Sequence, residues 1–157
     1  MFKRILVTVD GSPFASSAIS YAAEIAREFK SDVFVLHVHE REAGRAGAFP
    51  LETVDEAERV VADAVKTIQA NGIADVNGEV QHALSGHAAR HIVETAAQRK
   101  CDLIVMGSRG LSDIAGLMLG SVTHKVLQLA AVPVFVARGA APVPEKTLVG
   151  SAAAAAN

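Results

Sequence analysis

The chain has 157 residues, half of them hydrophobic and one fifth charged, as is typical of one globular domain. Its net charge of -2 gives no long-range attraction to nucleic acid or to an anionic membrane, and the scarcity of aromatic residues argues against a base-stacking surface. The one cysteine, Cys101, cannot form an intramolecular disulfide, which predicts a reducing cytoplasm. The apolar run before Asp10 is too short for a signal sequence or a membrane span.

Five apolar segments predict strands, over residues 2–9, 32–38, 76–83, 102–106 and 133–137. They alternate with helical patterns, which predicts an α/β protein with a single open, twisted, parallel five-stranded sheet and helices on both faces. The third strand contains Glu79, Gln81 and His82 and is the least apolar, so we expect it at an edge of the sheet.

The helices show start signals in the sequence. Ser12 is a favourable N-cap with Pro13 after it, and Thr53 and Glu56 have the spacing of a capping box, although a start one turn earlier stays open. The third helix is expected to open at residue 85 or 86, and the fourth covers residues 121–131. Residues 40–50 predict a mobile loop. The domain is expected to end at residue 138, before a disordered tail over residues 139–157.

The most informative motif is Gly107-Ser108-Arg109-Gly110, followed after nine residues by Gly120-Ser121. It lies between a predicted strand and a predicted helix. Glycines allow the backbone to approach a ligand, and the N-terminus of a helix favours an anion, so the arrangement suits phosphate. It is neither GxxxxGK[ST] nor a GxGxxG after the first strand. The alternative is a glycine-rich turn without a ligand.

As a phosphate site, this segment would use backbone N–H groups near Gly110, Gly120, Ser121 and Val122. The hydroxyl groups of Ser121 and Thr123 would complete the phosphate contacts, and Arg109 would add positive charge. In such sheets, ligands bind beyond the carboxyl ends of the strands, where the strand order reverses.

The spacing G-x2-G-x9-G-[ST] resembles the ATP-binding branch of the universal stress protein family. The resemblance extends over about residues 2–138 and includes the first strand ending in Asp10 and the segments 35–38, 102–107 and 133–136. It implies a Rossmann-like sheet with strand order 3-2-1-4-5 and an ATP site served by Mg²⁺ or Mn²⁺. It also implies a homodimer formed through the strand from Pro133 to Ala137.

The same resemblance implies further contacts. Asp10 would meet the ribose or the metal ion that accompanies the phosphates, although it also suits a cap of the first helix. The backbone of Val38 would meet adenine, while Met106 and Gly107 would line the ribose side. Thr8 stands at the same end of the first strand and completes the predicted site.

The histidines support other interpretations. His87 and His91 have an i, i+4 spacing that can hold zinc, but no HExxH motif, cysteine pair or clear third ligand accompanies them, so we favour a surface pair. His37 and His39 share one face of a predicted strand, which places them at the crevice or at the sheet edge.

The function expected from these features is that of an ATP-binding regulatory protein in the stress response, with at most slow ATP hydrolysis or autophosphorylation. No catalytic residues can be assigned from the sequence. The alternative is a genuine ATPase or nucleotidyl-transfer enzyme on a related fold, although neither an HxGH nor an SGGxDS sequence occurs. A receiver domain would need an acidic pair after the first strand, which is absent.

Overall fold

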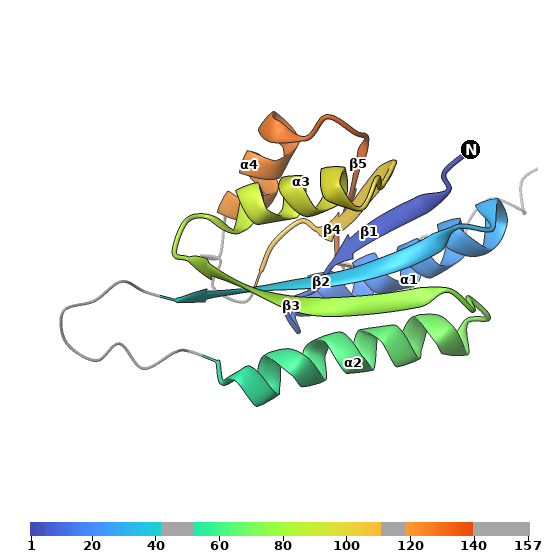
Figure 1. Ribbon diagram of the computed structural model, residues 1–157, viewed down its shortest axis with the longest axis horizontal. Coiled ribbons are helices and arrows are strands. Elements are labelled where there is room, and N and C mark those ends of the chain that lie inside the picture. Colours follow the sequence, from blue (N-terminus) through green and yellow to red (C-terminus); the bar gives the residue numbers. More distant parts are fainter. Residues whose placement is uncertain (42–51, 111–118, 140–157) are drawn as a thin grey trace, which may run out of the picture.

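The computed structural model describes residues 1–41, 52–110 and 119–139, in which strands and helices alternate along the chain (Figure 1). Their order is β1 (Arg4–Thr8), α1 (Pro13–Phe29), β2 (Asp32–Arg41), α2 (Val54–Ala70), β3 (Val76–Leu84), α3 (Ala88–Gln98), β4 (Leu103–Gly107), α4 (Ser121–Leu129) and β5 (Val134–Ala137). Most of the segment expected to be a mobile loop, and the expected tail from residue 140 onward, lie outside the described residues.

The strands form one parallel sheet in the order β3-β2-β1-β4-β5, which confirms the predicted topology. Helices α1 and α2 cover one face of the sheet, and α3 and α4 cover the other (Figure 1). The chain moves outward from β1 to β3 and then returns to place β4 on the other side of β1. The strand order therefore reverses between β1 and β4, where sheets of this class bind their ligands.

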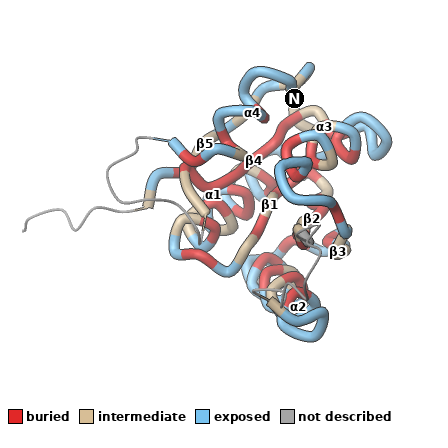
Figure 2. The backbone as a smooth tube through the Cα atoms, turned by 90° about the vertical axis from the view of Figure 1, so that its left-hand side faces the viewer, coloured by how far each residue is buried: buried red, intermediate tan, exposed pale blue. Residues whose placement is uncertain are grey.

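The hydrophobic core has two halves, one on each face of the sheet, and the most buried segments run through the middle of the molecule (Figure 2). In β1, Ile5 and Val7 belong to the half that contains α1, whereas Leu6 belongs to the half that contains α3. Such strands are buried on both faces, which explains their continuous apolar sequences. Cys101 lies in the second half, and burial raises its thiol pKa to about 11, so the thiol stays protonated and unreactive near neutral pH.

Two helix starts confirm the predicted caps. The Ser12 side chain accepts a hydrogen bond from the Ala15 N–H at 3.1 Å, and Pro13 is the first residue of α1. At α2, Thr53 Oγ1 accepts from the Glu56 N–H, and the Glu56 carboxylate accepts from the Thr53 N–H at 2.7 Å. These caps fix the start of both helices on the α1 and α2 face.

The structure corrects two predicted boundaries. Strand β2 continues to Arg41, because it stays paired with β3 as far as Leu84. Helix α3 begins at Ala88 rather than at residue 85 or 86, since Gly86 has a φ of +84°, which a right-handed helix cannot include. The Ala88 N–H donates instead to the Glu40 carboxylate of β2 at 2.9 Å.

Candidate functional site

The predicted site lies where β1 and β4 end side by side. Val7 of β1 is paired with Val105 of β4, and the two strands end at Thr8 and Gly107. Beyond these ends the chain passes to opposite faces of the sheet, into α1 after β1 and toward α4 after β4 (Figure 1). The segments 8–11 and 107–110 therefore border the point where the strand order reverses.

Asp10 and Gly110 lie against each other at this point. A Cβ atom added to Gly110 would come within 2.8 Å of Asp10 Oδ2, so the carboxylate packs directly on the glycine backbone. The other carboxylate oxygen, Oδ1, accepts a hydrogen bond from the Ser12 N–H at 3.0 Å. Asp10 thus orders the turn before α1, whereas Ser12 is the N-cap of that helix.

Gly107 is needed for close packing between β4 and α1. A Cβ at this position would lie 2.9 Å from the backbone carbon of Phe14, which cannot move without shifting the first turn of α1. The guanidinium carbon of Arg109 lies 5.6 Å from the centre of the Phe14 ring. Arg109 therefore extends over α1 from the first glycine-bearing turn.

The first turn of α4 carries backbone donors that have no partner among the described residues. The Gly120 N–H donates to the Ser108 carbonyl at 2.8 Å and so fixes the start of α4 to the turn after β4. In residues 1–41, 52–110 and 119–139, nothing accepts a hydrogen bond from the N–H groups of Ser121, Val122 and Thr123. These N–H groups and the positive end of the helix dipole favour an anion at this point.

The two hydroxyl groups of this turn differ in their contacts. Thr123 is buried, and its Oγ1 donates to the Gly107 carbonyl at 2.9 Å. Its donor is therefore used inside the protein, where it ties α4 to the end of β4. Ser121 is exposed at the helix start and keeps its hydroxyl available.

Three other predicted residues share one apolar wall. Met106 is buried in the core half under α3 and α4, and Val38 and Val122 pack against that same cluster. Thr8 is half-buried and is paired with Leu36 of β2. The wall lies on the same face of the sheet as α4.

Sequence reasoning missed a buried hydrogen-bonded link near the same strand ends, on the opposite face of the sheet. His37 is only 5% exposed, its Nδ1 lies 2.6 Å from the Val9 carbonyl, and its Nε2 lies 2.7 Å from the Glu52 carboxylate. His39 Nε2 lies 3.1 Å from the Glu52 carbonyl. The shared face of the histidines was visible in the sequence, but Glu52 lies outside the strands and gave no signal.

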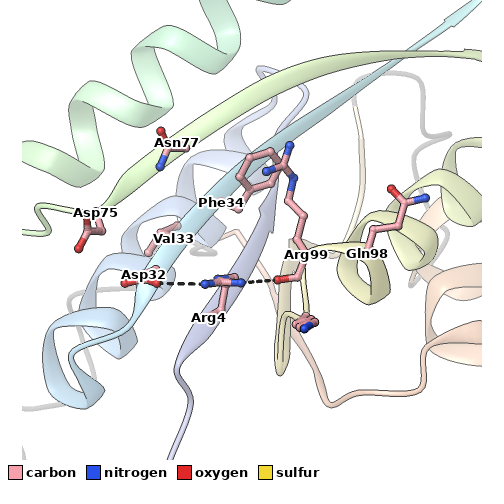
Figure 3. A pocket seen from close by; sticks show the side chains of 9 residues that line it. Arg4, Asp32, Val33, Phe34, Asp75, Asn77, Gln98 and Arg99 are labelled. Carbon is pink, nitrogen blue, oxygen red and sulfur yellow. Dashed lines mark hydrogen bonds and ion pairs between the residues drawn. The ribbon is translucent and has the colours of Figure 1, made fainter.

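A pocket of about 630 Å³ lies at the other end of the sheet, beside the amino-terminal ends of the strands (Figure 3). Two of its cations are paired within the protein: Arg4 pairs with Asp32 at 3.6 Å, and Arg99 pairs with Glu79 at 2.7 Å and stacks on the Phe34 ring. A third cation, Lys100, also lines the pocket.

No three His, Cys, Asp or Glu side chains among the described residues are placed to hold a metal ion together. His87 and His91 are no exception. No helix in the described ranges is long and apolar enough to cross a membrane.

Comparisons with known proteins agree with this fold. The model of the universal stress protein family matches residues 1–138, and the chain belongs to this family. Universal stress protein YxiE of Bacillus subtilis is 32% identical, over 88% of this chain and all of its own. Protein MJ0577 of Methanocaldococcus jannaschii has a similar structure, with a TM-score of 0.72 and 25% identity over 88% of this chain and 96% of its own.

Two similar structures contain nucleotides. One is a universal stress protein in complex with cAMP, with 25% identity, a TM-score of 0.68, and coverage of 88% of this chain and 99% of its own. The other is the universal stress protein from Archaeoglobus fulgidus in complex with dAMP, with 28% identity and a TM-score of 0.62. The match covers 86% of this chain and 97% of that one.

Proposed function

We propose that the protein binds ATP in the crevice between β1 and β4 and acts in the cytoplasm as a nucleotide-dependent regulatory protein. The proposal rests on the first turn of α4. Its N–H groups are unpaired within the described residues, and the hydrogen bond from the Gly120 N–H to the Ser108 carbonyl fixes the position of the helix start. Two similar structures are complexes of universal stress proteins with nucleotides, which supports a nucleotide as the class of ligand.

The residues at the crevice fit the parts of ATP. Phosphate oxygens would accept hydrogen bonds from the N–H groups of Ser121 and Val122 and from the Ser121 hydroxyl. The apolar wall of Val38, Met106 and Val122 suits a purine ring. Asp10 would repel a triphosphate unless a cation lies between them, so the nucleotide is expected to bind with Mg²⁺ or Mn²⁺.

A regulatory role fits this site better than rapid catalysis. A triphosphate with its divalent ion supplies part of the machinery for slow hydrolysis or autophosphorylation. Ser121 carries an exposed hydroxyl group and is itself one of the proposed phosphate contacts. The Thr123 hydroxyl, in contrast, already donates to the Gly107 carbonyl. Ser121 is therefore the first candidate to accept a phosphoryl group.

The two hydroxyl residues of α4 are expected to respond differently to substitution. Ser121→Ala should weaken ATP binding by about 1–3 kcal/mol, the usual loss for a hydrogen bond to a charged group, without changing stability. Thr123→Val leaves the Gly107 carbonyl unsatisfied and should lower the free energy of unfolding by about 1–3 kcal/mol. ATP titration calorimetry and urea unfolding measure the two effects. Equal affinity of Ser121→Ala and wild type would remove Ser121 from the site.

We further propose a homodimer through β5, the strand expected from Pro133 to Ala137. Strand β5 lies at the edge of the sheet, and Phe135 is 37% exposed beside Tyr21 of α1. Exposed edges of this kind pair with a second chain. Phe135→Lys is expected to yield monomers in sedimentation, whereas Leu84→Lys, at an exposed apolar position on the other edge strand, should stay dimeric. A monomeric wild-type protein at micromolar concentration would contradict the dimer.

A further inference from the structure

Two histidines from neighbouring strands face each other on the side of the sheet that α2 covers. His39 of β2 and His82 of β3 are register partners in the parallel sheet, so their side chains leave the same face. Val35 and Val80, on the same face of these two strands, pack in the core half that contains α2. The Nδ1 atoms of the two histidines lie 3.3 Å apart. The pair therefore directs two imidazole nitrogens to one point near the carboxyl ends of β2 and β3.

The second nitrogen of His39 fixes the form of its ring. Its Nε2 lies 3.1 Å from the Glu52 carbonyl, which only accepts hydrogen bonds, so Nε2 carries the proton. The neutral ring therefore has its lone pair on Nδ1, the atom that faces His82. Histidines that bind metal ions donate their other N–H to a carbonyl or carboxylate in the same way. Because His39 is only 4% exposed, its ring is held in this orientation by the folded protein.

His82 can supply a second lone pair without a net loss of protons. In the free protein, the Nδ1–H of His82 donates to the Nδ1 of His39. His82 is exposed, and its Nε2 makes no hydrogen bond to any of the described residues. Its proton can therefore pass through water from Nδ1 to Nε2. This change of tautomer leaves both Nδ1 lone pairs available to one ion.

We propose that His39 and His82 form a binding site for Zn²⁺. Zn–N bonds of about 2.0–2.1 Å at a tetrahedral angle place two ligand nitrogens about 3.3–3.4 Å apart. The distance between the two Nδ1 atoms is 3.3 Å, so an ion can bind with little movement of either ring. The square-planar geometry of Cu²⁺ or Ni²⁺ would need a separation of about 2.9 Å at the same bond length. The spacing therefore favours a tetrahedral ion.

The site is an open one, with two ligands from the described part of the chain. No third His, Cys, Asp or Glu from residues 1–41, 52–110 or 119–139 joins the pair. His37 is excluded because its ring nitrogens face the Val9 carbonyl and the Glu52 carboxylate. Water can complete the tetrahedron, as in zinc sites that keep a position open. An ion held here would join the end of β2 to the edge strand β3 and would bind whether or not ATP does.

The test is calorimetric titration of the metal-free full chain, without an affinity tag or nucleotide, with zinc chloride. Wild type is expected to bind a single zinc ion per chain. His82→Gln should lower the zinc affinity by at least about tenfold, since loss of a mere outer partner of a metal ligand already costs that much. His82 is exposed, and a glutamine amide can still donate to the Nδ1 of His39, so we expect the variant to fold.

His87→Gln is the matched control. His87 is also exposed, and its i, i+4 spacing to His91 is the other arrangement in the chain that can hold zinc. This variant should keep the zinc affinity of wild type. Because a ligand that binds the folded state stabilises it, zinc should raise the thermal unfolding temperature of wild type and of His87→Gln but not that of His82→Gln.

Imidazole nitrogen NMR identifies the ligand atoms directly. Zinc is expected to shift the Nδ1 signals of His39 and His82, to leave the proton of His39 on Nε2 and to move the proton of His82 to Nε2. Equal zinc affinity of wild type and His82→Gln would overturn the proposal, as would a wild-type protein that binds no zinc. Loss of binding in His87→Gln alone would also overturn it, because the ion would then lie on α3.

Discussion

Replacing Gly120 with valine is expected to abolish ATP binding while the protein stays folded. Gly120 is the buried N-cap of α4, with φ -67° and ψ 156°, a backbone conformation that valine readily adopts. Its N–H bond to the Ser108 carbonyl can therefore persist. The branched side chain would occupy the space through which a phosphate reaches the N–H groups of Ser121 and Val122.

The expected loss is large because several contacts disappear together. Losing two hydrogen bonds to phosphate costs about 3 kcal/mol or more, which is about a hundredfold or more in affinity. His87→Val is the matched control, since His87 is the exposed N-cap of α3 and its side chain makes no capping bond. ATP titration by calorimetry, with circular dichroism to check folding, compares the two. Wild-type affinity in folded Gly120→Val would show that phosphate does not approach this turn.

The second large effect concerns stability and the contact between β3 and α2. A Cβ atom at Gly78 would lie 2.6 Å from Val61 Cγ1 and 3.1 Å from Val65 Cγ2. Val61 is β-branched and held in one rotamer by its helix, so it cannot turn away freely. Gly78→Ala should therefore lower the free energy of unfolding by about 1–3 kcal/mol, outweighing the gain of up to about 1 kcal/mol from replacing a strand glycine.

A double-mutant cycle with Val61→Ala isolates this clash. Val61→Ala removes the closest methyl group, so Gly78→Ala should cost much less in that background than in wild type. Asn77→Ala, at the exposed neighbouring position of β3, serves as the control and should change stability little. Urea unfolding gives all four values. Strict additivity of the two substitutions would show that α2 does not press on Gly78.

The alternation of strands and helices was predictable because its signals are local, whereas the strand order in the sheet was implied by the family resemblance. Alternating apolar segments and helix caps such as Ser12 and Thr53 lie within a few residues of the elements they define, and the structure confirms both caps. The end of β2 was not predictable, since Glu40 and Arg41 are polar and join the strand only through pairing with β3. The start of α3 depended on the backbone conformation of Gly86, which residue type alone does not fix.

The site was predictable in part for the same reason. The glycines and hydroxyl residues at 107–110 and 120–123 follow a fixed spacing, so their roles could be proposed from the sequence. The bond from Thr123 to Gly107 and the contact of His37 with Val9 join positions far apart in the chain. Neither follows from a local pattern, and the first changes how Thr123 should respond to substitution.

The measurement that tests the ATP site most directly is the nucleotide carried by freshly purified wild-type protein. The protein is denatured, the released nucleotide is separated by ion exchange, and stripped protein is titrated with ATP in the presence and absence of Mg²⁺. We predict ATP or ADP in stoichiometric amount, or saturable ATP binding that Mg²⁺ strengthens. A protein that carries no nucleotide and binds none at millimolar ATP would contradict the account and leave the turn before α4 as a structural feature.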